Sequence, residues 1–204
     1  MKEKEILDIF KKTGAILEGH FQLSSGLHSA KYLQCAKVMA YPEYAEKLCK
    51  TLAKKILVKL TKPASPAGGH NAKPTAVIAP ALGGIIVSYE VARALGVKSL
   101  FTERVDGKMT LRRGFEISAK DKILVVEDVL TTGRSTNEVI EAVKSRGATI
   151  AGVGCIVNRS GKNLDLGLEI QSLIKIAIPT FKPENCPLCR KGLPAVKPGS
   201  RAIS

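Results

Sequence analysis

The chain has little aromatic surface and no tryptophan: Phe, Tyr and Trp make up 4% of its 204 residues. Proteins that bind single-stranded nucleic acids stack bases on aromatic side chains, and few are available here. Acidic residues are also scarce, because 18 Asp and Glu face 32 Lys and Arg, which leaves a net charge of +14. The basic residues form no tract of five or more, and no signature of a nucleic-acid-binding fold is present. The charge therefore indicates either a solvated basic surface or a site for an anionic small molecule.

Long apolar segments are missing as well. No run of about 18 apolar residues that would span a bilayer occurs. The segment Met1–Asp8 is charged, and no apolar region typical of a signal peptide follows it. The five cysteines are an odd number, which does not suit a fully paired disulfide framework. We therefore expect a reduced, soluble protein of the cytoplasm without a membrane partner.

The periodicity of apolar residues predicts an α/β protein. The length fits one domain with small additions. Apolar residues four apart and glycine stops predict helices at Lys4–Thr13, Pro42–Leu60, Gly83–Leu95 and Ser135–Arg146. Short apolar runs predict strands at Ala76–Ala79, Lys98–Phe101, Lys122–Glu127, Ile150–Val157 and Leu173–Ile178. Strands that alternate with helices are typical of a mostly parallel sheet flanked by helices.

Composition divides the chain into three parts. Residues 1–40 hold a leading helix and short strands or loops, and residues 41–178 hold the α/β core. Within the core, residues 61–73 (TKPASPAGGHNAK) are rich in Pro, Gly and Ala and lack periodicity, so we expect a flexible surface insert. Residues 179–204 form a Pro-rich tail that we expect to be irregular.

The most informative segment is Leu124–Thr136, which reads LVVEDVLTTGRST. A buried strand ends in two carboxylates, Glu127 and Asp128, and a helix follows shortly afterwards. In open α/β sheets, ligands bind beyond the carboxyl ends of the strands, and a helix amino terminus there suits a phosphate. Gly133 lets the backbone turn tightly and approach an anion. The pattern favours a sugar phosphate whose vicinal hydroxyls bind the carboxylates and whose phosphate accepts hydrogen bonds from Thr131, Thr132 and Ser135.

Each of these residues also has a plain structural interpretation. Thr131 or Ser135 would serve as a helix N-cap, and Glu127 and Asp128 would form a solvated turn. The complete arrangement favours the ligand site over this interpretation. The spacing matches neither a P-loop nor a dinucleotide-binding fingerprint.

The segment resembles the PRPP-binding signature of the type I phosphoribosyltransferases along all thirteen residues. The resemblance implies that fold, with a central mostly parallel sheet and a small N-terminal hood. It also implies that Glu127 and Asp128 hold the ribose hydroxyls of PRPP. The 5-phosphate would be wrapped by the following residues, which are Val129, Leu130, Thr131, Thr132, Gly133, Arg134 and Ser135. The expected cofactor is Mg²⁺, carried mainly by the oxygens of PRPP and without a direct protein ligand.

Other segments resemble the orotate phosphoribosyltransferases within this family. Residues 19–29 (GHFQLSSGLHS) and 32–36 (YLQCA) are similar to their N-terminal hood. Residues 79–84 (APALGG) are similar to their pyrophosphate loop, which implies contacts to pyrophosphate from Ala81, Leu82, Gly83 and Gly84. Relatives often hold a strained peptide in this loop, and Ala81–Leu82 is the candidate bond.

Two further segments complete the resemblance. Residues 103–115 (ERVDGKMTLRRGF) are similar to the mobile catalytic loop, with Arg104 and Lys108 as the expected catalytic cations beside Asp128. This loop reaches the neighbouring site in relatives, so a homodimer is expected. Residues 158–161 (NRSG) are similar to the segment whose Arg binds the orotate carboxylate, which implies Arg159, together with Thr131, as the orotate contacts.

The sequence departs from many bacterial members of the family at two places. Those members carry a lysine in the hood near position 24, where this chain has Ser24. They also carry a histidine in the mobile loop, which here has none and offers Arg104, Lys108, Arg112 and Arg113. We interpret both departures as variation within the family.

The resemblance implies transfer of the 5-phosphoribosyl group of PRPP to N1 of orotate, which yields orotidine 5′-monophosphate and pyrophosphate for UMP synthesis. Two alternatives stay open. One is a phosphoribosyltransferase for another base, which the hood segment and Arg159 argue against. The other is a PRPP-sensing regulator that binds nucleic acid, which would use the positive charge but has no recognisable binding module in the sequence.

Cys186 and Cys189 form a C-x-x-C pair in the tail. One such pair supplies half of a tetrahedral zinc site, which Cys35, Cys49 and Cys155 or a second chain would have to complete. No thioredoxin-like context surrounds the pair, so a redox role is disfavoured. A packing or turn role is the default interpretation.

Overall fold

The computed structural model describes residues 1–23, 25–61, 73–160 and 164–198. Nearly all of the predicted insert at 61–73 lies outside the described residues, as do Ser24 of the hood segment and Gly161 of the NRSG segment.

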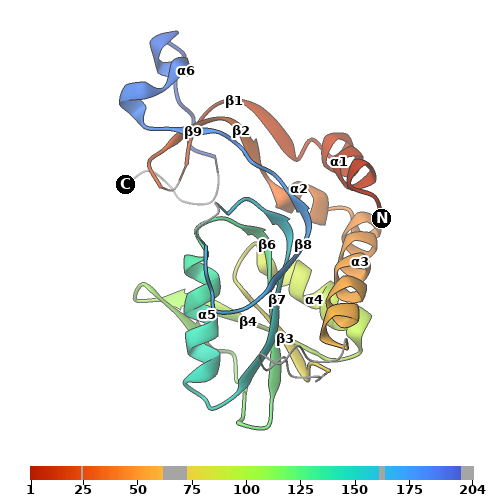
Figure 1. Ribbon diagram of the computed structural model, residues 1–204. Helices are drawn as coiled ribbons and strands as arrows, with labels where there is room; N and C mark the ends of the chain where they lie inside the picture. Colours follow the sequence, from red (N-terminus) through yellow and green to blue (C-terminus); the bar gives the residue numbers. More distant parts are fainter. Residues whose placement is uncertain (24, 62–72, 161–163, 199–204) are drawn as a thin grey trace.

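The core is a six-stranded sheet in the order β5-β4-β3-β6-β7-β8 (Figure 1). Its strands are β3 (Ala76–Pro80), β4 (Lys98–Val105), β5 (Lys108–Leu111), β6 (Lys122–Leu130), β7 (Thr149–Asn158) and β8 (Ile170–Lys175). Neighbouring strands are parallel except for the β4–β5 pair. The mostly parallel α/β sheet expected from the sequence is therefore confirmed.

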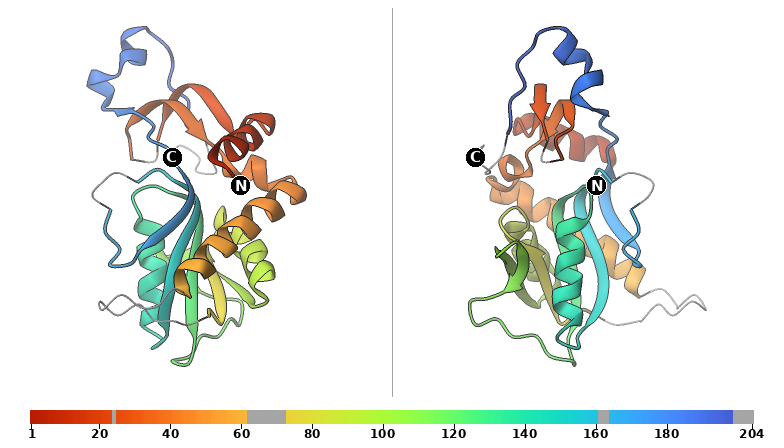
Figure 2. Two further views of the ribbon diagram at one scale, coloured as in Figure 1. Left: turned by 45° about the vertical axis from the view of Figure 1, so that its right-hand side comes forward. Right: turned by 90° about the vertical axis from the view of Figure 1, so that its left-hand side faces the viewer.

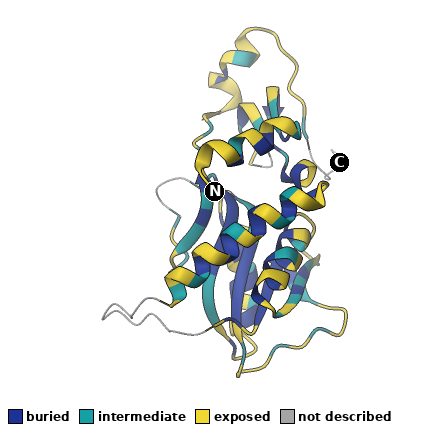
Figure 3. Ribbon diagram, turned by 90° about the vertical axis from the view of Figure 1, so that its right-hand side faces the viewer, coloured by how far each residue is buried: buried dark blue, intermediate teal, exposed yellow. Residues whose placement is uncertain are grey.

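Helices cover both faces of this sheet. On one face lie α3 (Pro42–Leu60) and α4 (Gly84–Leu95), which pack over Val77, Ala79 and the other inward residues of that face. On the opposite face α5 (Arg134–Lys144) packs over Ile78 and its neighbours (Figure 2). Figure 3 shows the face that α3 and α4 cover. Because successive residues of a strand point to opposite faces, a fully apolar strand such as β3 contributes to both layers of the core.

A second, smaller sheet forms the hood. Its strands are β1 (Ile16–Gln22), β2 (His28–Leu33) and β9 (Thr180–Phe181), so the first and last parts of the chain meet in one sheet. The helices α1 (Glu3–Lys12) and α2 (Cys35–Met39) flank it. Figure 1 shows the hood beyond one end of the main sheet, with the tail folded against it.

The tail is more ordered than the sequence indicated. After β9 it forms a 3₁₀ turn at Pro183–Asn185 and the one-turn helix α6 (Pro187–Arg190). Val196 then pairs with the hood, because its carbonyl accepts from the N–H of Gln22 and its own N–H donates to the carbonyl of His20, both at 2.8 Å. The expectation of an irregular tail was wrong, because pairing with β1 and β2 supplies order that the local sequence lacks.

Residues 103–115 also differ from the expected aperiodic loop. The end of β4 turns at Asp106–Gly107 into β5, and the two strands pair antiparallel from Thr102↔Leu111 to Val105↔Lys108. This hairpin extends the sheet at its edge.

No helix among the described residues is long and apolar enough to cross a membrane.

Candidate active site

The predicted site residues gather at the carboxyl edge of the main sheet. The chain leaves β3 through α4 toward β4 on one side, and leaves β6 through α5 toward β7 on the other. The adjacent strands β3 and β6 therefore form the point where the winding direction reverses, which is where open α/β sheets bind ligands. Residues 81–84 follow β3, residues 127–135 end and follow β6, and residue 159 follows the neighbouring strand β7.

The loop after β3 lies against the acidic end of β6. A Cβ atom added to Gly83 would lie 2.8 Å from Oδ2 of Asp128, and one added to Gly84 would lie 2.7 Å from the Cβ of Ala79. Both positions therefore exclude any larger residue without displacement of a neighbour. The Ala81–Leu82 peptide bond, which the resemblance singled out, is cis. Leu82 is 75% exposed.

Glu127 and Asp128 are partly buried at the end of β6. Burial raises the pKa of Glu127 to about 7, against the lowering effect of a hydrogen bond that its Oε2 accepts from Thr136 Oγ1 at 2.5 Å. Burial also raises the pKa of Asp128, although the backbone N–H groups of Val129 and of Asp128 itself oppose the shift. Neither carboxylate has an ion-pair partner among the described residues. The pair therefore retains acceptor capacity for hydroxyl groups of a ligand.

The turn after β6 exposes a helix amino terminus. Gly133 has φ +73°, and no side chain caps α5, whose first turn contains no acidic residue. The unpaired N–H groups of that turn suit an anion such as phosphate. Thr131 and Thr132 are exposed beside it, and Ser135 is partly buried. Val129 and Leu130 pack into the core instead, so they contribute backbone rather than side chains to the turn.

Arg159 follows β7 beside the turn after β6, where its backbone N–H donates to the carbonyl of Leu130 at 2.8 Å. Its Nε is buried and has no hydrogen-bond partner among the described residues. Burial lowers the pKa of the guanidinium, while the nearby Tyr32 and Cys35 of the hood side raise it. A buried guanidinium N–H without a partner is unfavourable, and an anionic ligand oxygen would satisfy it.

The two expected catalytic cations, Arg104 and Lys108, differ from each other in their ion-pair partners. Nη2 of Arg104 forms an ion pair with Oε2 of Glu138 at 2.8 Å, and Nε of Arg134 meets Oε1 of the same carboxylate at 2.9 Å. Glu138 thus brings Arg104 of the hairpin to the first turns of α5, beside the anion-binding turn. Lys108 is exposed on β5 and has no ion-pair partner in the described part of the chain.

Two further residues belong to the site but were not singled out from the sequence. Tyr32 on β2 lies near both Asp128 and Arg159, whose charges act on its pKa in opposite directions: burial and Asp128 raise it, and Arg159 lowers it. Thr136 hydrogen-bonds Glu127, as described above. The sequence did contain a signal for Thr136, because this residue ends the LVVEDVLTTGRST motif three positions after Gly133. No comparable signal marks Tyr32, because its approach depends on how the hood lies over the core.

Comparisons with known proteins agree with this geometry. A family model described as "Phosphoribosyl transferase domain" matches residues 45–178. The orotate phosphoribosyltransferase of Desulforamulus reducens is 53% identical over 204 residues, with all of both chains covered. That of Pelotomaculum thermopropionicum is 52% identical over 203 residues, again with all of both chains covered. The crystal structure of orotate phosphoribosyltransferase from Aeropyrum pernix has a TM-score of 0.67 at 24% identity, covers 84% of this chain and 93% of its own, and supports the fold alone.

Proposed function

The chain belongs to the orotate phosphoribosyltransferases, within the larger family of type I phosphoribosyltransferases, and we propose that it carries out their reaction at the carboxyl edge of its main sheet. It is a pentosyltransferase that moves the 5-phosphoribosyl group of PRPP to N1 of orotate. The products are orotidine 5′-monophosphate, a precursor of UMP, and pyrophosphate.

One observation carries the assignment of the acceptor base. The Nε of Arg159 is buried and has no hydrogen-bond partner among the described residues, and the charges that act on its guanidinium come from Tyr32 and Cys35 rather than from a described carboxylate. A guanidinium binds a carboxylate with two parallel hydrogen bonds, and orotate differs from uracil by a carboxylate. In our proposal Arg159 binds this carboxylate, and the exposed hydroxyl of Thr131 contacts the same base.

PRPP binds at the loops after β3 and β6. Glu127 and Asp128 accept hydrogen bonds from the vicinal ribose hydroxyls, because they are close together and have no cationic partner. The 5-phosphate lies at the uncapped amino terminus of α5, where residues 131–135 surround it. The backbone of Ala81–Gly84 faces the pyrophosphate, and Gly83 and Gly84 keep that approach open.

Mg²⁺ fits this site as a partner of the substrate. The carboxylate oxygens of Asp128 and Glu127 are ligands or water acceptors suited to a hard cation, yet they form no cluster of three metal-binding side chains. The ion would thus be held mainly by phosphate oxygens and would neutralise the leaving pyrophosphate. The chain itself then contributes orientation of the ribose and of its C1 atom.

Catalysis in this proposal rests on position and electrostatics. N1 of orotate attacks C1 of the ribose as the bond from C1 to pyrophosphate breaks, so positive charge develops on the ring. Asp128 and Glu127 lie beside the ribose and stabilise that charge, while Arg104 and Lys108 stabilise the negative charge of the leaving group. Closure of the hairpin over the site would exclude water that otherwise hydrolyses PRPP.

We further propose a homodimer in which the hairpin reaches the partner's site. Lys108 supports this arrangement, because it is exposed at the edge of the sheet and unpaired within the described chain. A cytoplasmic location is also proposed, since the substrates belong to nucleotide synthesis and no described helix would cross a membrane.

The experiment that tests the function follows the loss of orotate absorbance with purified protein, Mg²⁺ and PRPP, and measures pyrophosphate in parallel. Uracil, adenine and hypoxanthine serve as competing acceptors under the same conditions. We expect orotate consumption with one pyrophosphate released per orotate and no turnover of the other bases. Turnover of another base alone would overturn the assignment of Arg159, and PRPP binding without turnover of any base would favour the regulator.

A further inference from the structure

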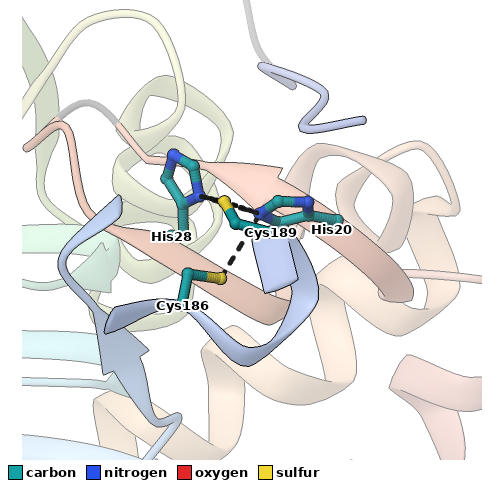
Figure 4. Close-up of side chains that lie close together, drawn as sticks. All are labelled: His20, His28, Cys186 and Cys189. Carbon is teal, nitrogen blue, oxygen red and sulfur yellow. Dashed lines mark hydrogen bonds between the residues drawn. The ribbon is translucent and has the colours of Figure 1, made fainter. Parts of the chain in front are cut away.

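Two histidines of the hood and the two cysteines of the tail meet in one cluster. His20 lies on β1, His28 on β2, Cys186 just before α6 and Cys189 within it (Figure 4). Their ligand atoms all lie within 4.8 Å of one another. No other group of three or more metal-binding side chains occurs in the described part of the chain.

The cluster has the ligand set of a closed structural zinc site. A tetrahedral Zn²⁺ bound at about 2.0–2.1 Å by nitrogen and about 2.3 Å by sulfur separates N from N by about 3.4 Å and N from S by about 3.6 Å. Nε2 of His20 lies 3.5 Å from Sγ of Cys186 and 3.7 Å from Sγ of Cys189. Nδ1 of His28 lies 3.2 Å from Sγ of Cys189. The two distances from His20 lie within about 0.1 Å of the spacing around a central ion, and the distance from His28 is about 0.4 Å shorter.

The ring of His20 is oriented as a metal ligand requires. Its Nδ1 lies 2.8 Å from the carbonyl oxygen of Leu193. A carbonyl only accepts, so Nδ1 carries the proton, and in the neutral imidazole the lone pair is on Nε2, which points into the cluster. Zinc-bound histidines generally donate their other N–H to such an oxygen. Nε2 of His20 and Nδ1 of His28 are 2.8 Å apart, and a central ion would separate them by about 0.6 Å to reach tetrahedral spacing.

The cysteines are also suited to bind. Both are free thiols, and the side chain of Cys186 is fully buried. The backbone N–H groups of Cys189 and Leu188 donate to the sulfur of Cys186, and Arg190 lies close by. Donation from the backbone to a ligand sulfur is the kind of support that orients bound thiolates.

The strand pairing explains why the histidines converge. Gln22 pairs directly with His28, so these two residues point to the same face of the hood sheet. His20 lies in the irregular stretch of β1 between Glu18 and Phe21, and its Nε2 approaches Nδ1 of His28 to 2.8 Å. The tail is held beside this face by the pairing of His28 with Phe181 and by the carbonyl of His20, which accepts from Val196.

We propose that His20, His28, Cys186 and Cys189 bind one Zn²⁺, which fastens the C-terminal tail to the hood. The sequence did not predict this set of four ligands. It offered Cys35, Cys49 and Cys155 as the missing ligands, but they are buried elsewhere, and the two histidines complete the set. The proposal is independent of the phosphoribosyl transfer reaction, because none of the four residues contacts the substrate site.

The first test measures metal in the untagged protein. We expect about one zinc per chain by elemental analysis. After removal of the metal under reducing conditions, Co²⁺ should produce thiolate-to-cobalt charge-transfer absorption and the visible bands of tetrahedral coordination, and Zn²⁺ should abolish both. Cys189→Ser and His28→Asn should lose the zinc and the cobalt spectrum. Cys49→Ala, which alters a buried cysteine of α3, should keep both.

Thermal unfolding supplies a second readout that does not depend on activity. Chelation should lower the Tm of the wild-type protein and of Cys49→Ala, and should leave that of Cys189→Ser unchanged. Two results would overturn the proposal: wild-type protein that takes up neither Zn²⁺ nor Co²⁺ with its thiols reduced, or a Cys186–Cys189 disulfide in protein purified without reductant. Because the cobalt spectrum is recorded on the wild-type chain, the test holds even where a variant fails to fold.

Discussion

Gly83 and Asp128 are packed so closely that a single methyl group between them would lie 2.8 Å from the Asp128 carboxylate oxygen. The loop after β3, which we propose binds pyrophosphate, and Asp128, which we propose binds the ribose, are therefore coupled by contact. Gly83→Ala should push the carboxylate out of position and raise the KM for PRPP at least about tenfold, or about 1.4 kcal/mol. Asp128→Asn should have an effect of similar size. Initial rates at varied PRPP and saturating orotate provide the measurement.

The matched control for this substitution is an alanine at a glycine whose neighbours leave room for a Cβ atom. A Cβ atom on Gly152 of β7 would meet only ordinary contacts at 3.7 and 3.8 Å. Gly152→Ala should therefore leave the KM for PRPP unchanged. Equal kinetic effects of the two alanine variants would argue against a specific contact between the loop and Asp128.

Glu127 should make both binding and stability depend on pH near neutrality. Its folded pKa of about 7 lies above the ordinary value of 4.5, because burial disfavours the charged form. The protonated form therefore stabilises the fold fully below pH 4.5, and this contribution is lost as pH rises through 7. Over the same range the carboxylate gains its charge and its ability to accept from ribose hydroxyls, so kcat/KM for PRPP should rise.

Glu127→Gln separates these two consequences. If the whole rise in the pKa of Glu127 acted on the free energy of unfolding, it would amount to about 3 kcal/mol. Solvent around the partly exposed carboxyl reduces this to about 1–2 kcal/mol. At pH 8 the variant should unfold at a higher temperature than the wild type, while its kcat/KM for PRPP falls and loses the rise through pH 7. Parallel Tm curves for the two proteins from pH 5 to 8 would contradict the shifted pKa.

Arg159→Ala should affect the two substrates unequally. If the buried Nε binds the orotate carboxylate, the KM for orotate should rise by about a hundredfold or more, that is about 2.7 kcal/mol, and the KM for PRPP much less. Arg146→Ala is the control, since that side chain lies just beyond the far end of α5 and donates to the carbonyl of Ala142. A larger change in the KM for PRPP than in that for orotate would reverse the assignment.

The proposed exchange of hairpins between subunits is testable by mixing variants. Lys108→Ala removes a hairpin cation and Asp128→Asn removes a ribose contact, so each homodimer should be impaired. If Lys108 acts in the partner's site, a mixed dimer contains one intact site, and activity should reappear when the two proteins are mixed and allowed to exchange. Activity no greater than the average of the two homodimers would place Lys108 in the site of its own subunit.

The main sheet and the turn of residues 131–135 could be predicted, because patterns within single segments of the sequence indicate them. The helix Pro42–Leu60 has the bounds expected from its four-residue spacing, and Leu124–Thr136 combined a buried strand, paired carboxylates, an αL glycine and a helix start. The structure places Glu127, Asp128 and the turn of residues 131–135 together with Gly83 and Arg159, as expected. The roles of these residues toward substrates stay predictions.

The misjudged parts depend on contacts between distant segments. The hairpin of β4 and β5 adds a strand at an edge of the sheet where the polar sequence suggested a loop. The tail becomes ordered because Val196 and Phe181 pair with hood strands more than 150 positions earlier. The same long-range pairing brings Cys186 and Cys189 to His20 and His28, and no spacing rule within one segment reveals that.

The parallel bridge between Phe21 and Val196 also has a consequence for biosynthesis. Chains generally begin to fold from the amino-terminal side while they are being made. The α/β core ends at β8, so it is complete before the tail is translated. The hood, by contrast, lacks its third strand and its last partner until β9 and Val196 have been translated. A nascent chain therefore acquires the scaffold of the main sheet first, and the hood is completed only after the tail has been made.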